Sequence, residues 1–399
     1  MSLTTHSSGS GMEPVELAFL LSSLPLRDDQ WQTVEREVAH VDLDELFDIA
    51  RRLGVGPLVV RLLADREGLP EQISRRAAVR RRDIITRNLR LSGELSRVVS
   101  ALDDAGVDAL PYKGPVLAEQ AYDDLASRSF SDLDLFVARE SVPAACRALE
   151  SLGFTRVQTR ATPEQIVADE SVIRLPREFK FKNGEVVVEI RWQFGNKSRP
   201  APISFADCWE RRTEMSVAGE MIPTLSLEDT LIILARHGAK HHWNRLGWIV
   251  DIAALVHNTD VEWDVLLTRA DELNLRRVVE SCLLLTAEIT DTDVPEEILE
   301  SARDDTHVEE VVESSKMYLA TNPSTAAYSR DHQRRLEFET RLCDSWRERL
   351  GYLGRIAFEP MQSDYEFLPL PRRLHGFYYG LRPIRIAAMA AKSIVPGTR

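Results

Sequence analysis

The sequence has few cysteines, and their spacing indicates neither a metal site nor a disulfide framework. Only four occur among 399 residues, at positions 146, 208, 282 and 343, and none falls in a CxxC pair. A structural zinc site needs clustered Cys and His ligands, and a disulfide framework needs paired cysteines. We therefore expect four reduced thiols, as in a cytoplasmic protein.

Long apolar runs and a leader-like N-terminus are also missing. No stretch of about 18 apolar residues occurs, so we expect no transmembrane helix. Residues 1–13 contain Ser, Thr and Gly, without a positive region followed by an apolar one. They predict a disordered tail and no secretory signal. These absences favour a cytoplasmic location.

An overall positive charge is lacking too, because the formal net charge is −13 and the pI is about 5.3. This balance excludes a global basic field for nucleic acid. A local exception is the arginine stripe, which consists of Arg75, Arg76, Arg80, Arg81, Arg82, Arg87 and Arg90. The stripe either binds RNA phosphates or is a solvated helix face with acidic partners, and we favour the second interpretation.

What is present indicates an α+β protein. Apolar residues recur at helical three- and four-residue spacings before and after a central part that alternates strand-like and helix-like segments. Asn183-Gly184 lies between two strand candidates and predicts a hairpin. We predict a disordered tail (1–13), a helical region (14–104), a mixed core (105–222), a helical domain (223–350) and a packed tail (351–399). In the core we expect helices over 115–122 and 142–152, and strands over 133–137, 172–175, 179–182 and 186–192.

Three acidic residues on two predicted strands are the strongest indication of chemistry. Asp132 and Asp134 are two apart in the run Ser-Asp-Leu-Asp-Leu-Phe-Val, so both side chains share one face of a strand. Like charges side by side are unfavourable unless water or a cation neutralises them. Glu189, on the later strand 186–192, completes a set of hard oxygen ligands if the two strands are neighbours. Such a set can hold two divalent metals, although a solvated strand end also produces an isolated DxD.

A second group of residues suits phosphate binding. Lys113-Gly114 precedes a helix that opens with Pro115, and a helix N-terminus with an adjacent glycine offers free backbone N–H groups to phosphate. Lys113 adds a positive charge, and Arg128 precedes the aspartates. The alternatives are a simple loop-to-helix turn and a surface arginine.

Together these segments resemble the uncharacterised nucleotidyltransferases of the DNA polymerase β superfamily. Those proteins share a lysine-glycine, an arginine and an aspartate-x-aspartate motif, here Lys113-Gly114, Arg128 and the motif that begins at Ser131. A third carboxylate typically precedes a His-Trp pair, and in this sequence Arg191 replaces that histidine. The resemblance runs from about residue 44 to residue 385 and is most specific over 110–137.

The resemblance also covers a helix predicted over residues 227–257. His237 and His241 are four apart and share a helix face, but no glutamate makes an HExxH motif, so zinc is disfavoured. The resemblance implies that this helix lies against the active site. Lys240 would then contact a triphosphate, and His237 would orient a carboxylate or transfer a proton. The alternative is that these histidines are hydrogen-bonded within the helical packing.

The resemblance implies a fold and an activity. The fold is a polymerase β-like mixed sheet with helices, set between helical N- and C-terminal regions. The activity is metal-dependent transfer of a nucleoside monophosphate from an NTP, with ATP expected, to an acceptor that is a small molecule, RNA or protein. Asp132, Asp134 and Glu189 would hold Mg²⁺ or Mn²⁺, and the triphosphate would meet Lys113, Gly114, Arg128, Ser131, His237 and Lys240. The alternative function is a nucleotide-binding regulator on the same fold with weak or no catalysis.

Overall fold

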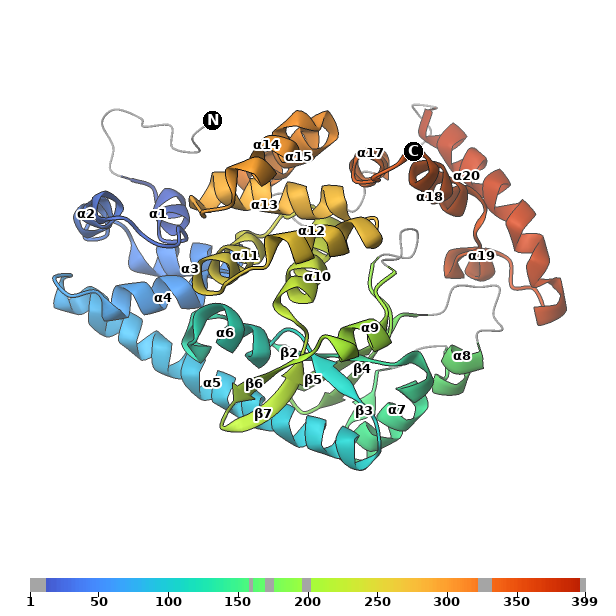
Figure 1. Ribbon diagram of the computed structural model, residues 1–399, viewed down its shortest axis with the longest axis horizontal. Coiled ribbons are helices and arrows are strands. Elements are labelled where there is room, and N and C mark those ends of the chain that lie inside the picture. Colours follow the sequence, from blue (N-terminus) through green and yellow to red (C-terminus); the bar gives the residue numbers. More distant parts are fainter. Residues whose placement is uncertain (1–11, 158–160, 169–175, 196–201, 322–331, 395–399) are drawn as a thin grey trace.

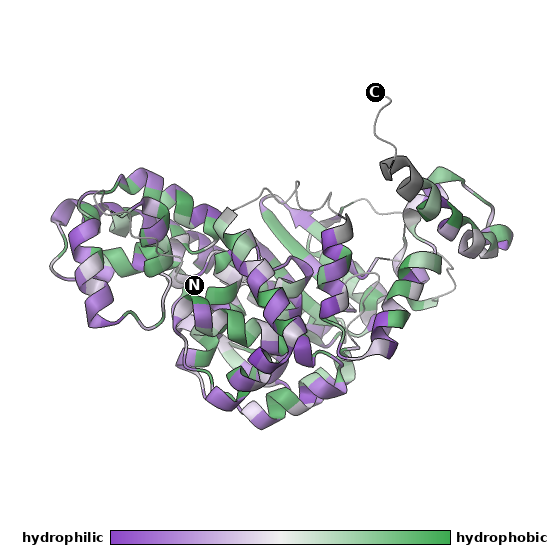
Figure 2. Ribbon diagram, turned by 90° about the horizontal axis from the view of Figure 1, so that it is seen from above, coloured by the Kyte–Doolittle hydropathy of each residue, from purple (hydrophilic) through white to green (hydrophobic). Residues whose placement is uncertain are grey.

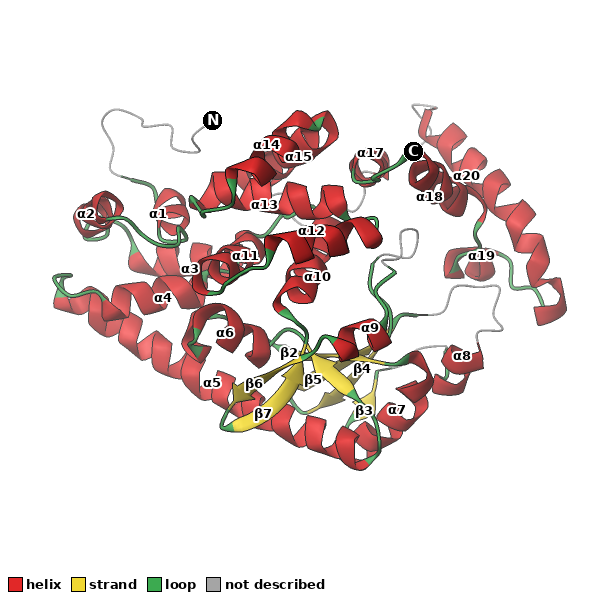
Figure 3. Cartoon of the chain, in the orientation of Figure 1, coloured by secondary structure: helices red, strands yellow, loops and turns green. Residues whose placement is uncertain are grey.

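The computed structural model describes residues 12–157, 161–168, 176–195, 202–321 and 332–394. The strand predicted over 172–175 lies outside this part of the chain, as does most of the disordered tail predicted over residues 1–13. The strands gather in one region between two groups of helices (Figures 1 and 3). This arrangement confirms the α+β prediction.

The N-terminal region is helical, as predicted. Its helices are Pro14–Leu20 (α1), Asp28–Glu37 (α2), Leu43–Leu53 (α3), Gly56–Asp65 (α4) and Glu71–Asp104 (α5). Helix α3 begins after Asp42, whose carboxylate accepts hydrogen bonds from the backbone N–H groups of Asp44 and Glu45, and ends before Gly54, which has a φ of 84°. Helix α5 continues past the other helices and lies along the sheet (Figure 1). It therefore joins the helical region to the core.

The main sheet is mixed. Its strands are Ala109–Pro111 (β1), Asp132–Val137 (β2), Thr155–Arg156 (β3), Glu178–Asn183 (β4) and Val186–Arg191 (β5). They lie in the order β1-β2-β5-β4-β3, with β2 and β5 parallel and the other neighbours antiparallel. The predicted hairpin is confirmed, since β4 and β5 join through a turn in which Gly184 has a φ of 58°.

Helices connect these strands and cover the sheet. They are Pro115–Tyr122 (α6), Val142–Ser151 (α7), Pro163–Ala168 (α8) and Phe205–Glu210 (α9), with short 3₁₀ turns at Leu125–Ser127 (η1) and Arg139–Ser141 (η2). A separate hairpin of Thr213–Val217 (β6) and Glu220–Thr224 (β7) follows. The helices predicted over 115–122 and 142–152 are thus confirmed, the second to within one residue.

Alternation along β2 divides its side chains between two apolar cores. Leu133, Leu135 and Val137 are buried with residues of α5 and α7 on one face of the sheet. Phe136 is buried on the opposite face, in the core that also contains α10 (Leu227–Lys240). Asp132 and Asp134 share the face of Phe136, so they are directed toward the C-terminal helical domain and away from α5.

That helical domain contains α10, Leu246–Asn258 (α11), Trp263–Glu272 (α12), Arg276–Thr290 (α13), Glu296–Asp304 (α14), Thr306–Thr321 (α15) and His332–Arg341 (α17). The prediction of one helix over 227–257 is wrong, because α10 ends at Lys240 and α11 begins at Leu246. His242 and Trp243 have φ values of 56° and 43°. The Trp243 indole folds back onto Gly238, where an added Cβ would come within 2.3 Å of its Nε1 atom. The missing side chain of Gly238 makes room for this reversal.

The last part of the chain is helical as well. It contains Trp346–Phe358 (α18), Gln362–Phe367 (α19), Arg372–Phe377 (η3) and Tyr378–Ile394 (α20). These helices pack on one another and lie to one side of the molecule (Figure 1), and the view from above shows the group near the C-terminus apart from the central helices (Figure 2). No helix in the described ranges is long and apolar enough to cross a membrane.

Candidate active site

Strand pairing brings the three predicted carboxylates onto neighbouring strands. In the parallel β2–β5 pair, Asp134 lies opposite Glu189 and Asp132 lies opposite Val187. All three acids point to the same face, since residues two apart on a strand share a face. Asp134 and Glu189 are 8% and 6% exposed, whereas Asp132 is partly exposed at the strand end. The sheet thus presents a row of acids that opens to solvent at Asp132.

Negative charge is concentrated along this row. Burial raises the pKa of Asp132, and the nearby charge of Asp134 raises it further. The same two causes, in the same order, raise the pKa of Glu189. Each shift means that the ionised form is disfavoured in the protein alone. A divalent cation between these side chains would reverse that penalty.

Two basic side chains contact Glu189 in place of such a cation. Lys180, directly opposite Glu189 in the β4–β5 pair, forms an ion pair with its Oε1 atom. Arg191 approaches Oε2 with its Nη2 atom at 3.7 Å and is also paired with Glu178. Within the described residues, no three Asp, Glu, His or Cys side chains already form a metal-binding group. The three acids therefore lie on one face of neighbouring strands, with Glu189 paired to Lys180.

Gly114 sets the Lys113-Gly114 loop directly against the first aspartate. Its φ of 59° and ψ of −130° lie in a region that side-chain-bearing residues avoid. An added Cβ would meet the backbone oxygen of Asp132 at 3.2 Å. Helix α6 begins at the next residue, and its first turn has no capping side chain. The backbone N–H groups that follow Pro115 in this first turn would suit an anion.

Lys113 is held by a histidine from the helical domain. Its Nζ atom is 3.0 Å from Nδ1 of His237. Burial lowers the pKa of His237 well below its usual value, and the charge of Lys113 lowers it further. A neutral ring accepts a hydrogen bond from the lysine, so His237 orients Lys113 rather than a carboxylate. His237, His241 and Trp248 also pack ring against ring, with centroids 5.0 to 5.2 Å apart.

Arg128 is fixed by a buried carboxylate on α11. Its Nε atom donates to both oxygens of Asp251, at 3.1 and 3.0 Å, and the hydroxyl of Tyr122 donates to the same group at 3.0 Å. Arg128 Nη1 also reaches the backbone oxygen of Gly114 at 3.5 Å. The arginine thus ties the Lys113-Gly114 loop to α11. Ser131 lies at the exposed end of β2, where its hydroxyl is 3.5 Å from Asp132 Oδ1.

Two cavities adjoin these residues and share Lys113 and His237. The first, of about 340 Å³ including open solvent, is bounded by Lys113, His237, Tyr112, Phe194, Gly195 and Ile233 and by the cations Arg191, Arg236 and Lys240. The second, of about 260 Å³, is bounded by Lys113, His237, Arg128, Leu234, Trp248 and Asp251. Lys240 therefore lies in the first cavity, with Arg191 and away from Arg128.

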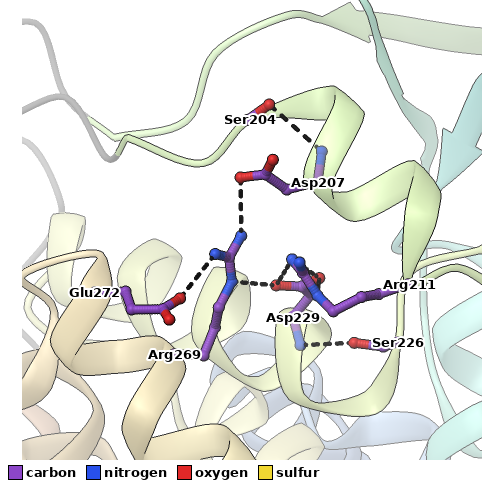
Figure 4. A network of polar contacts seen from close by, with 7 residues as sticks. All are labelled: Ser204, Asp207, Arg211, Ser226, Asp229, Arg269 and Glu272. Atoms are coloured by element: carbon purple, nitrogen blue, oxygen red, sulfur yellow. Dashed lines mark hydrogen bonds and ion pairs between the residues drawn. The ribbon is translucent and has the colours of Figure 1, made fainter.

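A buried polar network anchors the helix that carries His237 and Lys240. At the start of α10, the carboxylate of Asp229 accepts hydrogen bonds from Arg211 at 2.8 Å and from Arg269 at 3.3 Å (Figure 4). The hydroxyl of Ser226 caps the same helix by accepting from the Asp229 backbone N–H. Asp229 is buried, so the network joins α9, α10 and α12 without an unpaired carboxylate.

The arginine stripe on α5 is partly neutralised by acids. Arg76 and Arg80 both bind Asp44, at 2.5 and 2.9 Å. Arg81 pairs with Asp65, and Arg90 lies 3.3 Å from Glu185. These contacts match the interpretation of a solvated helix face with acidic partners. RNA binding by the stripe remains a prediction that they do not test.

Comparison with known proteins identifies the family. The sequence profile of a family described as "Uncharacterised nucleotidyltransferase" matches residues 39–291, well over half of the chain. The chain belongs to this nucleotidyltransferase family. No curated protein matches it. The nucleotidyltransferase is similar to the solution structure of the antibiotic-resistance factor ANT(2'')-Ia, with a TM-score of 0.25 and 13% identity, over 61% of this chain and 97% of that chain.

Sequence reasoning missed the basic partners of Glu189 in this nucleotidyltransferase. The sequence signal was only partial, because a turn centred on Asn183-Gly184 would set Lys180 opposite Val187. In the structure the turn lies one residue later, at Gly184-Glu185, and Lys180 is opposite Glu189. Tyr112 was also missed as a site residue. Its hydroxyl lies 3.3 Å from Asp134 Oδ1 and accepts from Arg191 Nε at 3.0 Å. This contact joins β1, β2 and β5 and needs the full sheet order to be foreseen.

Proposed function

We propose that the chain transfers a nucleoside monophosphate from an NTP, with ATP as the expected donor, to an acceptor in the cytoplasm. The single observation that carries this proposal is the register that sets Asp134 opposite Glu189, with Asp132 two residues away on the same face. The Gly114 loop lies against the backbone of Asp132, so a phosphate site adjoins the acids.

The donor set fits Mg²⁺ or Mn²⁺. Carboxylate oxygens are the ligands that these ions prefer. Burial, and then the charge of Asp134, raises the pKa of Asp132 and of Glu189, so a bound cation would favour the ionised forms of both groups. We propose that Asp132 and Asp134 hold the metal ions and that Glu189 joins them once it leaves Lys180. When bound, the metals polarise the α-phosphate and neutralise the charge that develops during transfer.

The remaining residues position the substrates. The Gly114 loop, the first turn of α6 and Lys113 would hold the β- and γ-phosphates, with Lys113 oriented by His237. Arg128 would support this loop from Asp251. An acceptor oxygen then attacks the α-phosphorus, the bond from that phosphorus to the bridging oxygen breaks, and pyrophosphate leaves toward α6. Glu189 would take the acceptor proton. Positioning and electrostatics would supply most of the catalysis.

Label transfer tests this function. The chain is incubated with α-labelled NTPs, Mg²⁺ or Mn²⁺ and cell extract, beside the Asp134→Asn variant. We expect label in an acceptor and equimolar pyrophosphate with the wild type only. An exposed control, Asp83→Asn on α5, should transfer label like the wild type. Equal transfer by wild type and Asp134→Asn would remove the catalytic assignment.

The contacts of Lys180 and Arg191 with Glu189 favour one alternative, a regulator that binds nucleotide without turnover. In that protein the third carboxylate would stay neutralised by its basic neighbours. Saturable nucleotide binding without pyrophosphate release, across all four NTPs and with extract present, would support the regulator.

A further inference from the structure

The strand register separates two ends of the acidic row. Gly114 contacts the backbone of Asp132, so the phosphate-binding loop lies at one end. Arg191 lies opposite Phe136, four residues farther along the parallel pair. At about 3.3 Å per residue, this places the backbone of Arg191 roughly 13 Å from that of Asp132. The Arg191 side chain reaches back to within 3.7 Å of Glu189 Oε2. Asp134 and Glu189 lie between the two ends.

The cavity at the Arg191 end is strongly basic. Arg191, Arg236 and Lys240 line it together with Lys113, and none of the described residues that line it is acidic. Its apolar wall includes Tyr112 and Phe194. The cavity is partly open to solvent, and its volume of about 340 Å³ includes that solvent.

The positive charge in this cavity is only partly balanced. Arg191 is paired with Glu178, and Arg236 lies 3.6 Å from Glu339. Across the described part of the chain, Lys240 has no carboxylate within ion-pair distance. Burial lowers the pKa of Lys240, and the charge of Arg191 lowers it further. The cavity therefore has an excess of positive charge that an anion would relieve.

The direction of the reaction decides which substrate enters this end. In phosphoryl transfer the attacking and leaving oxygens lie roughly in line, on opposite sides of the phosphorus. If pyrophosphate leaves toward Gly114, the acceptor must approach from the Arg191 end. In the proposed function the first turn of α6 and Lys113 hold the triphosphate, and Lys113 also lines the basic cavity, so the two substrates would meet at this lysine.

We propose that the acceptor carries a phosphate monoester, which binds in the cavity of Arg191, Arg236 and Lys240. This inference rests on the proposed nucleotidyl transfer. It moves Lys240 from the triphosphate, to which the family resemblance assigned it, to the acceptor. A phosphate monoester bears about two negative charges at neutral pH and three acceptor oxygens, which match a site of two guanidinium groups and an ammonium.

Binding of inorganic phosphate tests the proposal. Calorimetric or phosphorus NMR titrations are run on the full chain, with Mg²⁺ and a saturating non-hydrolysable ATP analogue already bound. We expect phosphate to bind without displacing the analogue. Lys240→Met should weaken phosphate binding about tenfold or more, because a charge-assisted contact is lost. The same variant should leave the affinity for the analogue within about threefold of the wild type.

Two controls keep the outcomes distinct. Lys240→Arg should retain phosphate binding, and Arg52→Met should leave it unchanged, because Arg52 is exposed on α3. Competition between phosphate and the analogue, an equal loss of both ligands in Lys240→Met, or no phosphate binding beside a bound analogue would overturn the proposal. If the analogue itself fails to bind the wild type, the nucleotidyl transfer on which the inference rests fails first.

Discussion

Replacement of Gly114 by alanine tests whether the backbone conformation of the Lys113-Gly114 loop is needed for nucleotide binding. The residue has a φ of 59° and a ψ of −130°, a conformation that costs a side-chain-bearing residue about 1 to 3 kcal/mol. The new Cβ would lie 3.2 Å from the backbone oxygen of Asp132, so the loop or β2 must also shift by a few tenths of an ångström. Either response moves the free N–H groups of α6 relative to the aspartates.

We expect Gly114→Ala to lower the free energy of unfolding by about 1 to 3 kcal/mol. We also expect about a tenfold loss of affinity for a Mg²⁺-bound, non-hydrolysable ATP analogue, since misplaced N–H groups lose a charge-assisted contact. Urea unfolding measures the first quantity and calorimetric titration the second.

Gly93→Ala is the matched control, because Gly93 lies inside α5 with open space around its Cβ position. Alanine there should stabilise the helix by about 1 kcal/mol and leave nucleotide binding unchanged. If Gly114→Ala kept both the wild-type stability and the wild-type affinity, the loop would not have the strained, closely packed role described above.

Three further predictions concern buried charge. Burial lowers the pKa of His242 from 6.5 to about 3. Between these two pH values the unfolded state binds a proton at this residue and the folded state does not, so the free energy of unfolding decreases as the pH falls from 6.5 toward 3. At pH 5 the loss is about 2 kcal/mol relative to pH 7, and His242→Gln should reduce the pH dependence of chemical unfolding by that amount. Asp251→Asn should cost about 3 kcal/mol in urea unfolding, because it leaves the buried Arg128 without its carboxylate, and a loss below 1 kcal/mol would contradict that role. Lys180 is 50% exposed, so Lys180→Met should strengthen Mn²⁺ binding only up to about fivefold, and weaker binding would show that Lys180 does not compete with the metal.

Local sequence patterns were sufficient for much of the core. The Asn183-Gly184 pair predicts the hairpin of β4 and β5, although the turn lies one residue later, at Gly184-Glu185. Period-two alternation places Asp132 and Asp134 on one face. Helix α3 was foreseen from its apolar spacing and from Gly54. These features depend on residues that are close in the chain, so they can be predicted from a single sequence.

The features that sequence reasoning missed depend on distant residues. The break after Lys240 occurs because Trp243 packs on Gly238, a contact that no helical period reveals. The pairing of Lys113 with His237 joins residues 124 apart, and that of Arg128 with Asp251 joins residues 123 apart. Each requires the packing of α10 and α11 against the sheet. The roles of Lys113, His237 and Arg128 therefore became specific only with the tertiary structure.

The central claim is that acids from β2 and β5 capture a divalent metal next to a bound triphosphate. Electron paramagnetic resonance of Mn²⁺, titrated into the protein with a non-hydrolysable ATP analogue, measures this directly. The account predicts bound Mn²⁺ in the wild type and in Asp83→Asn, and a large loss in Asp132→Asn and in Glu189→Gln. Equal Mn²⁺ binding in the wild type and Glu189→Gln would contradict a site shared between the two strands.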